Sequence, residues 1–208
     1  MAWLDSQPSR SVLYVSFGSL VKTSLAQLLE FWNGLVDSGY SFPWAIRPDM
    51  VDEENDNGVI SFPKVLEIGP KERGYIVDWA PQERVLAHDA VGGFLTHGGW
   101  NSILESILAE GPMIGWPNLG DQRVNVVCIR NVWRIGVELE ACDRWTIQRT
   151  IKTLMERRVE FQRSMDRIAK WARDSIDKNG SSCHNLEMFV DDLKKIKAKR
   201  LAALCRAA

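Results

Sequence analysis

The stretch WAPQERVLAHDAVGGFLTHGGWNS, residues 79–102, decides what kind of fold this chain has. Its middle, AVGGFLTH, is a nearly continuous apolar run, which is typical of a strand buried on both faces. A short helix, PQERVLAH, is predicted before that strand, and a second helix, WNSILESILAEG, after it. Two tryptophans and two of the three histidines of the chain lie in this region. The cluster is therefore either a buried structural unit or a ligand-facing surface.

The same alternation continues on both sides of this stretch. The helix TSLAQLLEFWNGLVDSG begins at a plausible N-cap, Ser24, and stops at Gly39. Pro43 is an awkward residue within a predicted strand, because it has no N–H. Strands alternating with helices predict an α/β fold with a Rossmann-like, doubly wound parallel sheet. The other predicted elements are the strands at 11–18, 41–48, 74–79, 112–117 and 135–140, and the helix at 121–133.

The pattern changes after Arg144, where only helices are predicted, at 146–155, 158–176 and 182 to about 199. We therefore expect a Rossmann-like domain at residues 1–144. Residues 145–208 are expected to be C-terminal helices that pack on this domain or extend from it. The acidic segment VDEENDNG, residues 51–58, is predicted to be a surface loop.

Composition excludes several classes of function. The 208 residues are 45% hydrophobic and 25% charged with a net charge of -1, which gives no electrostatic basis for nucleic-acid binding. No segment reaches the roughly 20 apolar residues of a membrane span, and the N-terminus has no leader pattern. The four cysteines are widely spaced, so we expect free thiols, a cytoplasmic location and no metal.

Three polar or glycine-containing segments follow predicted strands, at residues 17–19, 78–82 and 96–102. In an open α/β sheet, ligands bind beyond the carboxyl ends of the strands. The helix opened by Asn101 and Ser102 has free N–H groups that suit an anion such as phosphate. His97 can donate to the same anion, Glu105 can accept from a sugar diol, and Trp79 can stack on a base. Together these residues predict a nucleotide pocket.

Structural interpretations of the same residues remain open at this point. His97 and Ser102 are equally suited to capping the helix. Trp79 and Trp100 would more often be packing residues than ligand platforms. His88 follows an apolar helical pattern and is interpreted as structural or solvent-facing.

Residues 79–122 resemble the 44-residue plant secondary product glycosyltransferase signature of the UDP-dependent glycosyltransferases. The resemblance includes WAPQ, TH-x-GWNS, the glutamate after the serine and the closing DQ, and it extends over nearly the whole chain. It implies one half of a GT-B fold, in which two Rossmann-like domains face each other. This chain is expected to be the C-terminal, donor-binding half, and the N-terminal acceptor domain and its residues to be missing.

The resemblance also implies a role for each motif residue. Trp79 would stack on uracil, and the backbone of Ala80 would bind its edge. Two side chains would hold the ribose hydroxyls, four residues would hold the diphosphate, and three would address the sugar. These are Gln82 and Glu105 for the ribose; His97, Asn101 and Ser102, with Ser19, for the diphosphate; and Trp100, Asp121 and Gln122 for the sugar. Gly99 is a further expected donor-binding residue. The closing glutamine is associated with glucose, so UDP-glucose is the expected donor substrate, with no cofactor.

The implied reaction is an inverting transfer of glucose to a hydroxyl or carboxyl of a small hydrophobic plant metabolite. The sequences of two segments are similar to those of family members that act on iridoid or other terpenoid acceptors. The family's histidine base and its aspartate partner are absent, and none of His88, His97 and His184 is a credible replacement. The alternative function is therefore a UDP-sugar-binding module without catalysis. A third possibility is self-association through an exposed interdomain face.

The sequence departs from the family pattern at two places in the signature. Gly98 stands where cysteine or serine is frequent. The segment AEGPM puts Glu110 where glycine is typical, and Gly111 follows it. If the family's glycine ends the helix, its shift by one residue to Gly111 in this chain is expected to move the following strand slightly.

Overall fold

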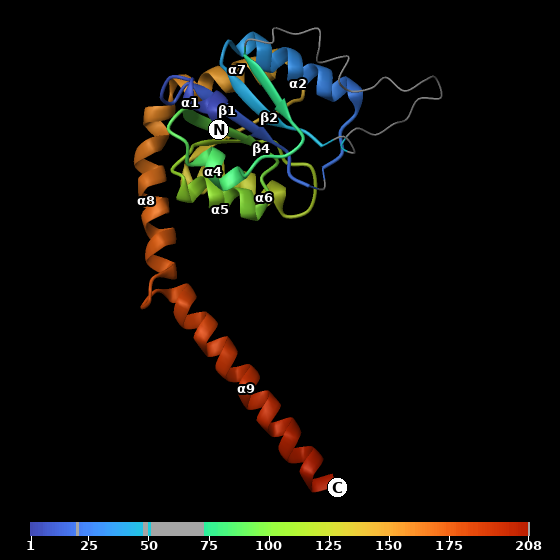
Figure 1. The fold of residues 1–208 in the computed structure, drawn as a ribbon, viewed down its shortest axis with the longest axis vertical. Coiled ribbons are helices and arrows are strands. Elements are labelled where there is room, and N and C mark those ends of the chain that lie inside the picture. Colours follow the sequence, from blue (N-terminus) through green and yellow to red (C-terminus); the bar gives the residue numbers. More distant parts are fainter. Residues whose placement is uncertain (20, 48–49, 51–72, 208) are drawn as a thin grey trace, which may run out of the picture. The chain divides into compact units, whose positions relative to one another are not determined.

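The computed structural model describes residues 1–19, 21–47, 50 and 73–207, so the acidic loop predicted at 51–58 lies outside the described residues. The described part contains six strands, with helices before, between and after them (Figure 1). The strands are β1 (Val12–Ser16), β2 (Phe42–Ala45), β3 (Gly74–Val77), β4 (Val91–Thr96), β5 (Met113–Gly115) and β6 (Gly136–Glu138). The helices are α1 (Ala2–Asp5), α2 (Leu25–Ser38), α4 (Gln82–Leu86), α5 (Trp100–Leu108), α6 (Gln122–Val127), the π-helix η2 (Cys128–Trp133), α7 (Arg144–Glu156), α8 (Arg158–Ile176) and α9 (Ser181–Ala207).

The strands form one sheet in the order β3-β2-β1-β4-β5-β6, and all the neighbouring pairs are parallel. This order confirms the predicted doubly wound, Rossmann-like sheet. The order reverses between β1 and β4, which pair side by side from Val12 to Ser16. The carboxyl ends of these two strands therefore lie next to each other, where such sheets bind ligands.

Helices cover both faces of the sheet. Figure 1 shows α2 and α7 on one face and α4, α5 and α6 on the other. α2 is a helix because Ser24 and Gln27 form a capping box at its start and Gly39 adopts a left-handed conformation at its end, as predicted. Its apolar side chains enter a core that both β1 and β4 line. Buried residues of this core include Val15, Phe17, Leu28, Phe31, Leu35, Trp44 and Leu95.

Pro43 does lie inside a strand, in β2, between β1 and β3. Its pairing with Tyr75 of β3 is regular. On the β1 side, Ser41 bridges Val12 and the ladder resumes at Trp44, which pairs with Val15. The ladder is thus interrupted at the residue that has no N–H to donate.

The chain divides into two compact units, residues 1–168 and 169–208. The first unit includes α7, one of the C-terminal helices expected after residue 144. α7 belongs there because it packs closely on α2: a Cβ at Gly34 would lie 2.7 Å from the Ile147 side chain, and Gln148 donates to the Asp37 carbonyl at 2.9 Å. Ile147 and Ile151 are consequently buried in the core.

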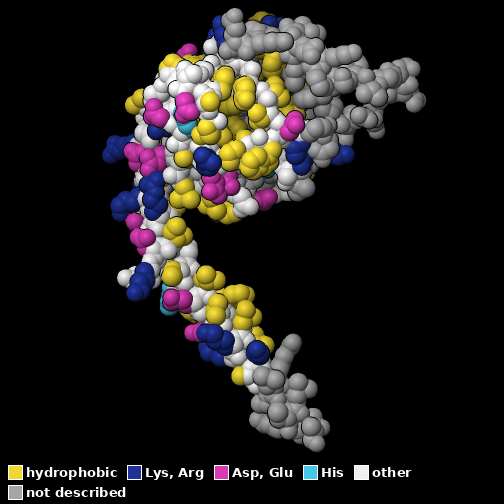
Figure 2. Space-filling model, in the orientation of Figure 1, with side chains coloured by type: hydrophobic (Ala, Val, Ile, Leu, Met, Phe, Trp, Pro, Cys, Tyr) yellow, Lys and Arg dark blue, Asp and Glu magenta, His cyan; other side chains and the backbone are white. Residues whose placement is uncertain are grey.

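The second unit contains α9, whose described side chains are mostly exposed. Hydrophobic side chains lie along this helix (yellow in Figure 2), among them Leu186, Phe189 and Leu193. Within the described residues, no helix is long and apolar enough to cross a membrane.

Candidate functional site

The carboxyl ends of β1 and β4 meet at His97. A Cβ built on Gly18, just after β1, would lie 2.5 Å from Cε1 of the His97 ring, and one on Gly99 would lie 2.4 Å from its Nε2. The imidazole is therefore held between two glycines that leave no room for a side chain. Burial lowers the pKa of His97 below its usual 6.5, although the negative charge of Asp121 opposes the shift. The ring is neutral at neutral pH, with one N–H to donate.

The N-terminus of α5 follows directly. Its N-cap residue is Gly99, and within the described part of the chain no side chain caps it. The capping interpretation of His97 and Ser102 is therefore not supported. Asn101 is exposed in the first turn, where the backbone N–H groups have no intrahelical partners. The helix end is free to bind an anion through these groups.

Gln82 joins the segment after β3 to α5. Its Nε2 donates to Oγ of Ser102 at 3.0 Å and to Oε2 of Glu105 at 2.6 Å. The Tyr14 hydroxyl contacts Oε1 of Gln82 at 3.4 Å from the other side. Both N–H groups of Gln82 are thus used, and three predicted site residues form one hydrogen-bonded group. Sequence reasoning did not find Tyr14, which reads as an ordinary core residue.

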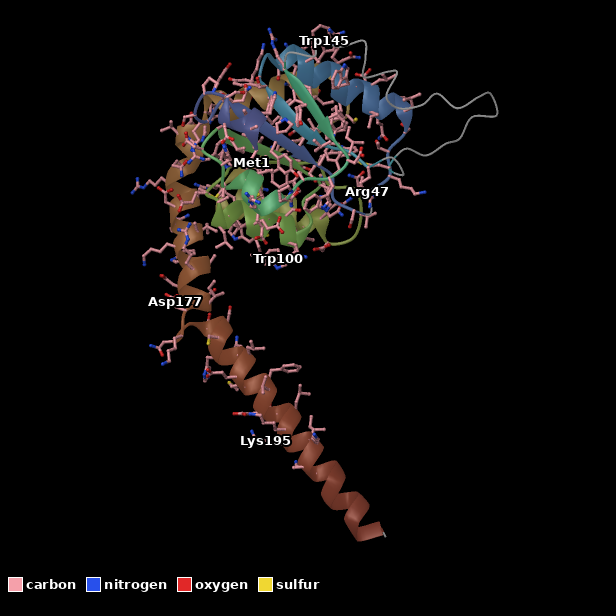
Figure 3. The ribbon with its side chains drawn as sticks, in the orientation of Figure 1. Met1, Arg47, Trp100, Trp145, Asp177 and Lys195 are labelled. Atoms are coloured by element: carbon pink, nitrogen blue, oxygen red, sulfur yellow. The ribbon has the colours of Figure 1, made fainter. Side chains whose placement is uncertain are left out.

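The two tryptophans have different surroundings. Trp79 is 75% exposed, so it is not a core residue. Trp100 begins α5 and is 46% exposed, with its ring centroid 6.2 Å from that of Trp133 (Figure 3). The packing interpretation is therefore excluded for Trp79 and holds only in part for Trp100.

The loop before α6 places Asp121 and Gln122. Asp121 is exposed, whereas Gln122 is buried, and its Oε1 accepts from the backbone N–H groups of Asn118 and Leu119 at 2.8 and 3.0 Å. The carbonyl oxygen of Gln122 therefore shapes this loop, and the amide NH₂ is the group left for a ligand. Sequence reasoning missed Asn125, which donates from α6 to the carboxylate of Asp121.

The remaining predicted residues occupy simpler positions. Ser19 is exposed just after β1, and Ala80 is partly buried between Trp79 and α4. His88 contacts Asp5 at 3.0 Å and accepts from the Ala90 N–H at 3.1 Å, which agrees with its structural interpretation. Within the described residues, no group of three or more His, Cys, Asp or Glu side chains is placed to hold a metal ion.

A family model described as UDP-glucoronosyl and UDP-glucosyl transferase matches residues 1–172. The chain belongs to this family of UDP-glycosyltransferases. A similar relative is the 7-deoxyloganetic acid glucosyltransferase of Catharanthus roseus, 50% identical over 196 residues, which cover 93% of this chain and 40% of that protein. A myricetin 3-O-rhamnoside 1,2-glucosyltransferase of Crocosmia x crocosmiiflora is 44% identical, over 94% of this chain and 41% of that protein.

Solved structures of plant UDP-glycosyltransferases share the fold. Os79 from O. sativa, crystallised with UDP, matches with a TM-score of 0.80 and 35% identity over 92% of this chain and 42% of that one. UGT73P12 of Glycyrrhiza uralensis, complexed with glycyrrhetinic acid 3-O-monoglucuronide, matches with a TM-score of 0.80 and 34% identity over 96% of this chain and 44% of that one. The UDP-glycosyltransferase resemblance of residues 79–122 is thereby confirmed. This UDP-glycosyltransferase chain spans about two-fifths of the length of the relatives it matches.

Proposed function

We propose that this chain binds UDP-glucose and is the donor-binding part of an inverting glucosyltransferase. One observation supports this most: Gln82, Ser102 and Glu105 form a hydrogen-bonded group beside an uncapped helix N-terminus and His97. A nucleoside diphosphate needs these features together, namely acceptors for the ribose and donors for the phosphates.

In this proposal, the exposed ring of Trp79 stacks on the uracil, and the backbone of Ala80 binds the edge of that base. Gln82 occupies one carboxylate oxygen of Glu105, so the other oxygen accepts from the ribose hydroxyls. Gln82 acts mainly by orienting Glu105 and Ser102, since both of its own N–H groups are already donated.

The diphosphate lies at the start of α5. Ser102 accepts from Gln82, which leaves its own O–H to donate to a phosphate oxygen. Further donors come from the neutral imidazole of His97, from the first-turn N–H groups near Gly99 and Asn101, and from the hydroxyl of Ser19. As the glycosidic bond of the donor breaks, negative charge grows on the β-phosphate, and these preorganised donors stabilise it.

The glucose lies toward α6 and Trp100. The exposed carboxylate of Asp121 accepts from sugar hydroxyls, and the amide NH₂ of Gln122 donates to them. This division of roles follows from the carbonyl oxygen of Gln122 being occupied by its own loop. Trp100 contributes an apolar surface for the sugar.

The acceptor hydroxyl or carboxyl requires a base within hydrogen-bond reach. His97 is proposed to bind phosphate, and His88 is engaged with Asp5. We propose that the base and the acceptor site belong to the part of the relatives that this chain does not span. The acceptor is proposed to be a small hydrophobic plant metabolite of the iridoid or terpenoid class, which the similarity to a 7-deoxyloganetic acid glucosyltransferase supports.

Titration calorimetry with UDP and UDP-glucose, paired with a turnover assay on a panel of acceptors, tests the proposal. We expect binding of both nucleotides, loss of at least about tenfold in affinity for UDP in His97→Ala, and little or no turnover by these 208 residues alone. Absence of nucleotide binding would contradict the donor-site proposal. Robust glucosylation would instead show that the chain carries its own base.

Two further expectations stay predictions. The first is a cytoplasmic location, which the three described cysteines support because they are free thiols. Self-association through an exposed face would appear as concentration-dependent light scattering.

A further inference from the structure

Asn125 connects two parts of the proposed site. From the middle of α6, its Nδ2 donates to Oδ2 of Asp121 at 2.8 Å and to the backbone carbonyl of Gly98 at 3.0 Å. Both of its N–H groups are therefore used, one toward the proposed sugar contact and one toward the turn that carries His97. In the described part of the site, this is a direct side-chain link between α6 and that turn.

The neighbouring residue fixes the helix that carries Asn125. Val126 is fully buried, and its Cγ2 lies where side chains at two glycines would need space. A Cβ at Gly98 would be 2.8 Å from this methyl group, and one at Gly115 would be 2.5 Å from it. α6 therefore sits directly against β5 and the turn after β4. Asn125 has little freedom to move, and the hydrogen bonds that it makes hold specific atoms in place.

We propose that Asn125 is a positioning residue that aligns the Asp121 carboxylate with the turn at residues 97–99, so that the sugar and diphosphate subsites act as one donor site. This inference rests on the proposed function of those two subsites. Asn125 occupies Oδ2 of Asp121, so Oδ1 is the oxygen presented to a sugar hydroxyl. The two hydrogen bonds of Asn125 show that the two subsites are close, and the effect of the Asp121 charge on the pKa of His97 agrees with this.

An isosteric substitution separates hydrogen bonding from packing. Asn125→Asp keeps the size of the side chain but removes both donors, and it places a carboxylate against Asp121 and the Gly98 carbonyl. Like charges at this distance repel, so Asp121 has to turn away. The effect of this variant therefore contains both the loss of the donors and the repulsion by the new charge. Asn125→Ala removes the donors without adding charge.

The experiment measures the affinities of UDP and UDP-glucose and the melting temperature for the wild-type chain and each variant. We expect Asn125→Asp to weaken UDP-glucose binding about tenfold or more and UDP binding only about threefold, which changes their ratio. Asn125→Ala should show the same trend less strongly. Gln148→Ala is the matched control. Gln148 lies on α7, away from the proposed site, and its amide likewise donates to a backbone carbonyl, that of Asp37, at 2.9 Å.

A double-mutant cycle adds the specific readout. In an Asp121→Ala background, Asn125→Ala should change the ratio of UDP-glucose to UDP affinity by less than about twofold, since its target is already gone. An unchanged ratio in both Asn125 variants, or fully additive effects in the cycle, would overturn the positioning role. If the wild-type chain bound neither nucleotide, the proposed function itself would fail. This result differs from one in which the wild-type chain binds both nucleotides and only the role of Asn125 fails.

Discussion

The imidazole of His97 occupies the space that a side chain at Gly18 would need, since an ideal Cβ at Gly18 would lie 2.5 Å from Cε1 and 2.6 Å from Nε2 of the ring. Gly18 also has a φ of +74°, which favours glycine. Two chain segments that are far apart in sequence are thus fitted to each other at the point where the strand order reverses. The position of the His97 ring is determined by the segment after β1 as much as by β4, the strand that His97 follows.

We expect Gly18→Ala to displace His97 and to weaken UDP binding at least about tenfold. The cost to stability should be about 1–3 kcal/mol beyond the strain of an alanine at positive φ. Gly39→Ala is the matched control, since Gly39 has a φ of +83° and the nearest atom to its Cβ position is the Arg73 side chain at 4.0 Å. Equal losses of UDP affinity in the two variants, measured by calorimetry, would argue against the steric role of Gly18.

The stability of the fold should depend on pH through His97. Burial lowers the pKa of this residue in the folded chain, so near pH 6.5 and below the unfolded chain takes up a proton that the folded chain resists. Above about pH 6.5 His97 is neutral in both states and the free energy of unfolding is not reduced. It falls as the pH drops through the pKa of the unfolded chain toward the lower pKa of the folded chain. Urea titrations from pH 7.5 to 5 should therefore show a smaller decline for His97→Gln than for wild type. Parallel curves for the two proteins would refute this assignment.

Gln82 offers a test of the ribose group. Gln82→Glu removes the donors to Ser102 and Glu105 and puts a second carboxylate beside Glu105, so UDP affinity should fall more than in Gln82→Ala. We expect a loss of about tenfold for alanine and more for glutamate. Glu83→Gln, on the exposed neighbouring residue, is the control and should bind UDP like wild type. The idea fails if the glutamate variant binds as well as the alanine variant.

Glu110 carries a backbone strain that glycine would relieve. It follows the C-cap of α5 with a φ of +58°, the left-handed conformation in which helices commonly end on glycine. Glu110→Gly should raise the free energy of unfolding by about 1 kcal/mol, because the strain of a side chain at this φ disappears. Glu110→Ala keeps a Cβ and should give little of this gain. Equal gains from both variants in urea titrations would assign the effect to the side chain instead.

Much of the fold could be predicted from sequence, because each signal was local. Alternating strand and helix patterns gave the six strands, and Ser24 and Gly39 marked the ends of α2. The short helix α1 was missed, and the helix predicted at 121–133 is divided into α6 and the π-helix η2. α1 is a single turn without an apolar period, and residues 128–133 continue the pattern of the helix before them.

The candidate site was less accessible to sequence reasoning. The motif residues lie near the strand ends, as the sequence pattern predicts, but their mutual hydrogen bonds depend on tertiary packing. Nothing in the spacing of Gln122 indicates that its carbonyl oxygen is used by the loop at Asn118 and Leu119. Asn125 reads as an ordinary polar residue of a helix until the turn at Gly98 is placed beside it.

The contact of Val126 with two glycines has a consequence for how this family varies. Because one methyl group fills the space beside both Gly98 and Gly115, these three positions cannot change size independently. Relatives that carry a cysteine or serine at the position of Gly98 are expected to carry a residue smaller than valine at position 126. An alignment of many members would then show these two sites covarying, with the pair Gly and Val forming one combination and a larger residue with alanine or glycine forming the other.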